Sequence, residues 1–121
     1  MISVKNNKQQ ARRAEKAVVM TKKINDNVAM MILENAEMVN TLNTKAYLEI
    51  SFQKKLCTER GDKLCKICVI YWKAIDSYSI IVNTVTDMSN SVFNFDAAIE
   101  MVDFLGKIFS DEVIDLSRII R

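Results

Sequence analysis

The sequence predicts an all-α fold: a single-domain antiparallel bundle of four to five helices that begins with a long N-terminal helix. Three observations support this prediction. The 121 residues include no proline and only two glycines, so the residues that most often interrupt helices and build tight hairpins are nearly missing. Half of the residues are hydrophobic, enough for one core. Apolar residues recur at steps of three and four along much of the chain.

Basic residues are concentrated near the N-terminus. Residues 1–23 hold seven basic groups and one acid, a net of +6, and because the whole chain carries +2, residues 24–121 carry −4. We expect residues 1–10 to be a flexible basic arm and residues 11–121 to be the single helical-bundle domain. The basic groups are candidate contacts to a protein partner or to nucleic-acid phosphates. They are Lys5, Lys8, Arg12, Arg13, Lys16, Lys22 and Lys23.

Contact between this arm and an anionic membrane surface is an alternative, as is a solvated arm without a partner. No aromatic platform, helix-turn-helix signature or zinc finger accompanies the basic residues.

The first long helix is expected over residues 24–56. Its apolar seam alternates steps of four and three and consists of Ile24, Val28, Met31, Asn35, Met38 and Leu42. The pattern weakens at residues 40–44, where residues of low helix propensity cluster and favour a break or kink. A strand over residues 47–52 is the local alternative, because apolar residues there have a period nearer two.

Four residues of this helix are candidates for a helix interface: Met30, Met31, Asn35 and Met38. Methionine adapts to irregular surfaces, whether in a core or against a partner helix. Met30 and Met31 point about 100° apart on a helix, so both cannot face one narrow seam. Asn35 either fixes the register of a helix pair or lies at the solvent edge of a wide stripe.

A central helix is expected over residues 64–85, after a turn at Gly61 and Asp62. The steps of four and three persist for three heptads along Leu64, Cys68, Tyr71, Ile75, Tyr78, Val82 and Val85. Residues 87–94 are predicted to connect this helix to another at residues 97–108, capped by Asn94 or Asp96. A last helix is expected from Ser110 to the C-terminus.

All three cysteines, Cys57, Cys65 and Cys68, lie in the stretch CTERGDKLCKIC. A tetrahedral zinc site needs four ligands, and the chain has no histidine to supply the fourth. A redox CxxC pair usually starts a helix that follows a strand. Packing is therefore the favoured role over metal or redox chemistry, and we expect three reduced thiols with no metal or cofactor. Whether Cys57 and Cys65 face one another across the turn is an open question.

The absence of histidine excludes Ser-His-Asp and Cys-His catalysis within one chain, and we expect no enzyme activity. The leading hypothesis is a non-catalytic interaction module that presents a helical surface to a protein partner, as a small regulator, inhibitor, assembly factor or chaperone. Homodimerisation is a further expectation. The alternative is a nucleic-acid-binding protein that uses the basic arm and first helix.

The sequence also indicates where the protein works. Lys73 and Asp76 interrupt the most apolar stretch, so no transmembrane segment is expected. No secretory signal is visible, and three cysteines cannot all pair within one chain. We therefore expect a cytoplasmic, reducing setting.

Overall fold

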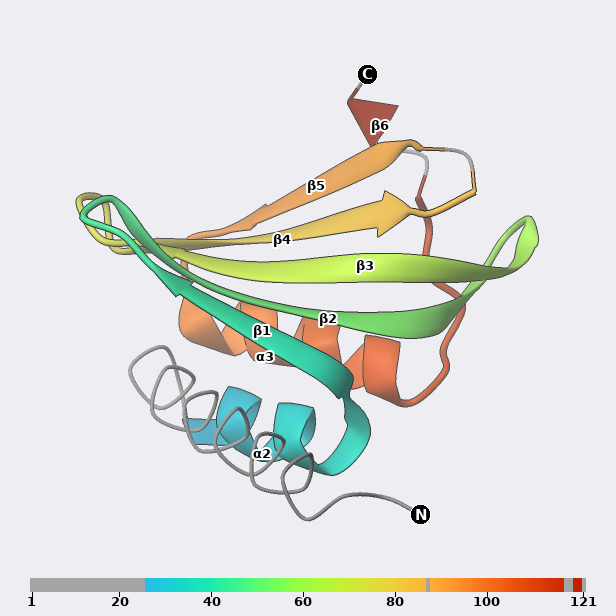
Figure 1. Cartoon of the computed structure of the whole chain (residues 1–121), viewed down its shortest axis with the longest axis horizontal. Helices are drawn as coiled ribbons and strands as arrows, with labels where there is room; N and C mark the ends of the chain where they lie inside the picture. Colours follow the sequence, from blue (N-terminus) through green and yellow to red (C-terminus); the bar gives the residue numbers. More distant parts are fainter. Residues whose placement is uncertain (1–25, 87, 117–118, 121) are drawn as a thin grey trace, which may run out of the picture.

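The protein is mainly an antiparallel sheet, as shown by a computed structural model that describes residues 26–86, 88–116 and 119–120 (Figure 1). The strands follow one another across the sheet in the order β1-β2-β3-β4-β5-β6, each antiparallel to the next. The prediction of an all-α helical bundle with coiled-coil-like seams is therefore wrong. The described elements are α2 (Asp26–Asn35), β1 (Glu37–Asn43), β2 (Tyr47–Thr58), β3 (Gly61–Trp72), β4 (Ser77–Thr84), β5 (Asn90–Phe95), α3 (Ala98–Phe109) and β6 (Ile119–Ile120).

The expected central helix over residues 64–85 is the hairpin of β3 and β4. Tyr71 pairs with Tyr78, and a turn at residues 73–76 joins the two strands. The sequence of a strand that buries side chains on both faces is a continuous apolar run. Within such a run, apolar residues also occur at steps of three and four, so the pattern resembles that of a helix. The abundance of β-branched and aromatic residues here favours strands, and that preference prevails over the apparent period.

The expected long helix over residues 24–56 ends early, because α2 stops at Asn35. The chain then forms β1 and β2, and the strand alternative for residues 47–52 is confirmed as the first half of β2. The break predicted at residues 40–44 falls at the end of β1. There the backbone N–H of Tyr47 donates to Oγ1 of Thr44 at 3.0 Å, which closes the hairpin.

The chain forms hairpins although it has only two glycines and no proline. Asp76, in the turn between β3 and β4, has φ +48°, and Met88, between β4 and β5, has φ +51°. Gly61, with φ +96°, follows the two-residue turn at Glu59 and Arg60 and pairs with Thr58. Aspartate tolerates positive φ because its short polar side chain can form hydrogen bonds with the nearby backbone. Gly61 and Asp76 therefore provide the positive φ angles of two of the turns.

The helix predicted at residues 97–108 is confirmed as α3. Its N-cap is Ala97, which makes no side-chain capping bond, so the predicted caps Asn94 and Asp96 are wrong. The last predicted helix is also wrong, because residues 112–116 are not helical and Ile114 bridges to Thr58 at the end of β2. The backbone N–H of Ile114 donates to the carbonyl of Cys57 at 2.8 Å.

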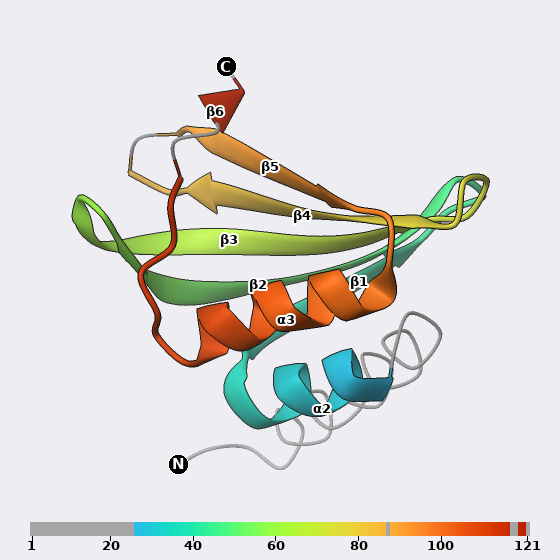
Figure 2. The same cartoon turned by 180° about the vertical axis from the view of Figure 1, so that it is seen from behind.

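Both described helices lie on the same side of the sheet (Figure 2). We call this side the covered face. Phe104 of α3 packs against Phe93 and Phe95 of β5, with ring centroids 4.5 and 5.6 Å apart, and Phe109 stacks on Phe52 of β2 at 5.3 Å. The buried apolar strand residues of this face are Leu48, Ile50, Phe52, Leu56, Cys65, Ile67, Val69, Ile80 and Val82.

Helix α2 completes this layer by packing against α3. Val28 and Ile32 are fully buried, together with Met101, Leu105 and Ile108 of α3. Of the described helices, none is long and apolar enough to cross a membrane.

Candidate functional site

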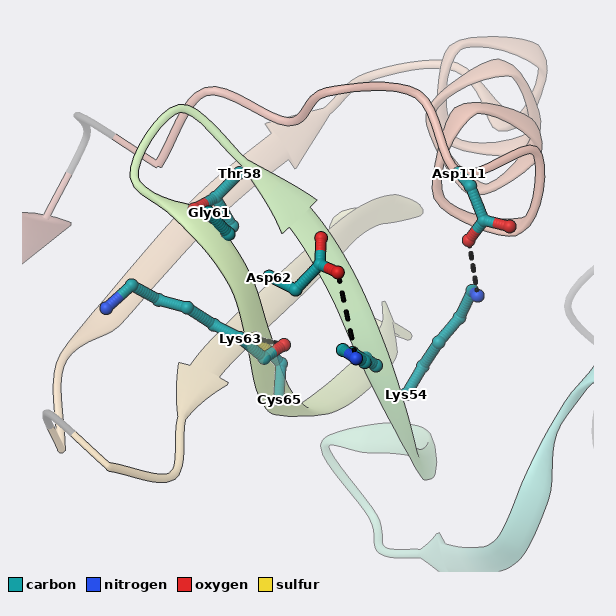
Figure 3. A network of polar contacts seen from close by, with 8 residues as sticks. Lys54, Thr58, Gly61, Asp62, Lys63, Cys65 and Asp111 are labelled. Atoms are coloured by element: carbon teal, nitrogen blue, oxygen red, sulfur yellow. Dashed lines mark hydrogen bonds and ion pairs between the residues drawn. The ribbon is translucent and has the colours of Figure 1, made fainter.

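The cysteine-containing stretch is the hairpin of β2 and β3, not a bend between helices (Figure 3). Oγ1 of Thr58 donates to the carbonyl of Gly61 at 2.7 Å and accepts from the backbone N–H of Arg60 at 3.2 Å, which fixes the turn. Cys57 pairs with Asp62 and Cys65 pairs with Lys54, so the side chains of Cys57 and Cys65 point to opposite faces of the sheet. The two thiols therefore do not face one another.

The three thiols are free in this structure. Burial raises the pKa of Cys65 above its ordinary value, and the positive charge of Lys63 opposes that shift only in part. Burial, followed by the negative charge of Glu49, raises the pKa of Cys68. Because the thiolate is the nucleophile and metal ligand, both cysteines are poorly suited to chemistry at neutral pH. Within the described ranges, no cluster of acidic and cysteine side chains is arranged to hold a metal ion.

Two ion pairs hold the end of the sheet that carries this hairpin. Nζ of Lys54 lies 2.9 Å from Oδ1 of Asp111, which joins β2 to the turn after α3 (Figure 3). Lys55 and Asp62 are 3.7 Å apart across β2 and β3, and both side chains are largely exposed. The Lys55–Asp62 pair is exposed and contributes little stability, whereas the Lys54 side chain is only 19% exposed and its pair fixes β2 to the turn after α3.

The candidate residues of the basic arm, from Lys5 to Lys23, lie outside the described residues. The four candidate residues of the helix interface do not share one surface in the structure. Met30 is exposed on α2, whereas the half-buried Met31 approaches α3, because a Cβ placed on Gly106 would lie 4.0 Å from its Cε. Asn35 ends α2, and its Nδ2 donates to the carbonyl of Met31 at 3.0 Å. Met38 belongs to β1, so the predicted helical seam does not extend to it.

The second face of the sheet is the strongest candidate surface. Among the described elements, none covers it, and we call it the open face. Its residues follow from the strand register, because side chains alternate between the two faces. Its central row runs straight across four strands and consists of Ser51, Cys68, Ile81 and Val92.

Two further rows flank the central row. The acidic row, on the side of the turn between β3 and β4, consists of Glu49, Ile70, Ser79 and Asn94. The lysine row, on the side of the turn between β2 and β3, consists of Gln53, Lys66, Asn83 and Asn90. Polar and apolar side chains are therefore mixed on the open face.

An aromatic pair and a hydrogen-bond chain order one end of the open face. The rings of Tyr47 and Trp72, paired across β2 and β3, lie 5.4 Å apart. Nε1 of Trp72 donates to Oγ of Ser79 at 2.9 Å, and that hydroxyl donates to Oδ1 of Asn94 at 2.7 Å. The chain crosses three strands, so the tryptophan is held in place with its polar edge satisfied.

Apolar side chains remain accessible at the margins of this face. Leu42, Leu64 and Val85 are 45%, 46% and 49% exposed. Leu64 and Val85 are neighbours, because the backbone N–H of Val85 donates to the carbonyl of Leu64 at 3.0 Å. In the central row, Ile81 and Val92 are half-buried, whereas Ser51 and Cys68 are buried among their neighbours. Ordered aromatic residues with accessible aliphatic side chains and a polar surround are typical of protein-binding surfaces.

The sequence interpretation missed this surface, because its residues are adjacent only in the sheet register. One signal was present in residues 48–53, where apolar Leu, Ile and Phe alternate with Glu, Ser and Gln at period two. No protein-family model, curated protein or solved structure matches this chain significantly.

Proposed function

We propose that this chain is a non-catalytic interaction protein that binds a protein partner through the open face of its sheet. The observation that carries the proposal is an ordered, partly apolar sheet face that no described element covers. The role of a small regulator, inhibitor, assembly factor or chaperone is retained, with the sheet replacing the helical surface expected from the sequence. A cytoplasmic, reducing setting belongs to the same proposal, because three cysteines cannot all pair within one chain.

Three features support a binding role over a catalytic one. The chain has no histidine, and the two buried thiols have raised pKa values. The polar groups at the aromatic end of the open face bond to one another, so they order the surface and leave the accessible apolar side chains at its margins for a partner.

Affinity purification with single-residue variants tests the proposal. The full chain serves as bait in nuclease-treated lysate from native cells, so that retained partners are held by protein contacts. We expect Leu64→Lys and Leu42→Lys to lower recovery of the bound protein at least about tenfold, because each places a charge in a desolvated contact. Both side chains are accessible, so the fold tolerates the change.

Ile99→Lys is the matched control. Ile99 is 70% exposed on α3, so the substitution replaces an accessible aliphatic side chain by the same charge on the other side of the molecule. Recovery should match that of the unmodified chain. Loss of the partner in Ile99→Lys with full retention in Leu64→Lys would contradict the proposal.

A further inference from the structure

The two sides of the open face carry opposite net charge on β2 and β3, because Glu49 lies on one side of the central row and Lys66 and the Lys55–Asp62 pair lie on the other. On β2 and β3 this face carries two acids, Glu49 and Asp62, and two bases, Lys55 and Lys66. Lys55 and Asp62 pair with each other. Glu49 and Lys66 stand in the two rows on opposite sides of Cys68. The Glu49 carboxylate accepts a hydrogen bond from the Cys68 thiol, and neither Glu49 nor Lys66 has an ion-pair partner among the described residues.

The ends of the open face also differ in a complementary way. Beyond the acidic row lie the aromatic rings of Tyr47 and Trp72, and beyond the lysine row lie the aliphatic side chains of Leu64 and Val85. A half-turn about an axis along the central row exchanges the two ends. It would place the lysine row of one copy over the acidic row of another, and Leu64 over the aromatic pair.

The size of the face suits such a contact. Five strands about 4.8 Å apart, on average about nine residues long at 3.3 Å rise, span roughly 700 Å², and about half of their side chains point to this face. A stable interface of standard size covers about 800 Å² on each partner. Two sheets that pack face to face lie about 10 Å apart, which leaves room for one layer of interdigitated side chains from each copy.

We propose that the open face binds a second copy of this chain, with the two sheets packed face to face about a two-fold axis along the central row. This inference rests on the proposed function and names the partner. In the dimer, each strand lies over its own copy, so Lys66 on β3 reaches sideways by one strand spacing of about 4.8 Å to Glu49 of the partner subunit on β2, and the two-fold repeats the pair. A surface that only bound an unrelated protein would need no such correspondence between its own two halves.

Charge reversal combined with sedimentation velocity tests this dimer. The full chain should sediment at twice its monomer mass. Lys66→Glu and Glu49→Lys should each raise the dissociation constant at least about tenfold, because each opposes like charges twice at the interface. The double variant Glu49→Lys with Lys66→Glu restores opposite charges and should return the constant to within about threefold of the original. Ile99→Lys, on α3, should leave it unchanged.

Circular dichroism establishes that each variant is folded, and Leu64→Lys provides a second disruption that does not alter the charged pair. The inference is overturned by a chain that stays monomeric at the highest concentration reached, or by a dimer indifferent to Lys66→Glu. It is equally overturned if the double variant fails to restore the dimer. A monomer whose Leu64→Lys variant loses another protein removes only this inference, whereas open-face variants without effect on either assay remove the proposed function as well.

Discussion

The two faces of the sheet use the same strands for different purposes. On the covered face, β2 contributes Ile50, Phe52 and Leu56, all fully or almost fully buried, and aromatic rings connect it to α3. On the open face, the same strand contributes Glu49, Gln53 and Lys55, with Ser51 between them. One strand therefore supplies the core on one side and a mixed surface on the other.

This difference separates stability from binding. Burial of apolar area is the main favourable term in folding, and nearly all of it lies between the covered face and the helices. The open face is ordered by its register and by the bonds of Trp72, Ser79 and Asn94, and contributes less burial. Substitutions on the two faces should therefore affect different measurements.

The largest expected effect comes from Phe52 on the covered face. Phe52→Ala removes a fully buried ring that stacks on Phe109, and should lower the free energy of unfolding by about 3–5 kcal/mol. Val92→Ala, which truncates a half-buried residue of the central row, should cost about 1 kcal/mol. Urea denaturation followed by circular dichroism, at a concentration where the chain is monomeric, measures both values. Equal losses would show that the faces do not divide stability and binding in this way.

The sequence was most informative where an element has one apolar face. Met101, Leu105 and Ile108 recur at helical spacing against the exposed acids Glu100 and Asp103, and α3 was predicted within two residues. In β3, by contrast, residues 67–70 are buried on both faces, so no polar residue marks the period of two. The helical steps through Leu64, Cys68 and Tyr71 linked residues from both faces of a strand.

The open face was beyond sequence reasoning for a related reason. Trp72, Ser79 and Asn94 belong to three strands, and their contact depends on how β3, β4 and β5 align. Register follows from turn geometry, and two of these turns use positive φ at Asp76 and Met88, which composition alone did not indicate. The stretch from Cys57 to Cys68 was correctly read as containing a turn, but the turn joins strands.

The two glycines sharpen the contrast between the sheet and the helices that cover it. Gly61→Ala should lower the free energy of unfolding by about 1–2 kcal/mol, because φ is +96° although a Cβ would meet nothing within 4 Å. Gly106→Ala should raise it by about 0.5–1 kcal/mol, because alanine is the better helix former. A Cβ there would make an ordinary contact with Met31. Thermal and urea unfolding of the pair should give opposite signs; the same sign for both would refute the backbone argument.

The smallest expected effect concerns the thiol of the covered face and its response to pH. Because burial raises the pKa of Cys65 above 9.0 in the folded chain, the unfolded chain loses this proton first as pH rises. The contribution to stability is complete below that value and is lost as pH increases through the folded pKa. Between about pH 8 and about pH 10, the unmodified chain should therefore lose more stability than Cys65→Ala. Urea unfolding under reducing conditions measures both losses, and Cys68→Ala should also reduce the loss, because burial and Glu49 raise the pKa of that thiol as well. An identical decline in all three chains would mean that neither thiol is held protonated by its place in the sheet.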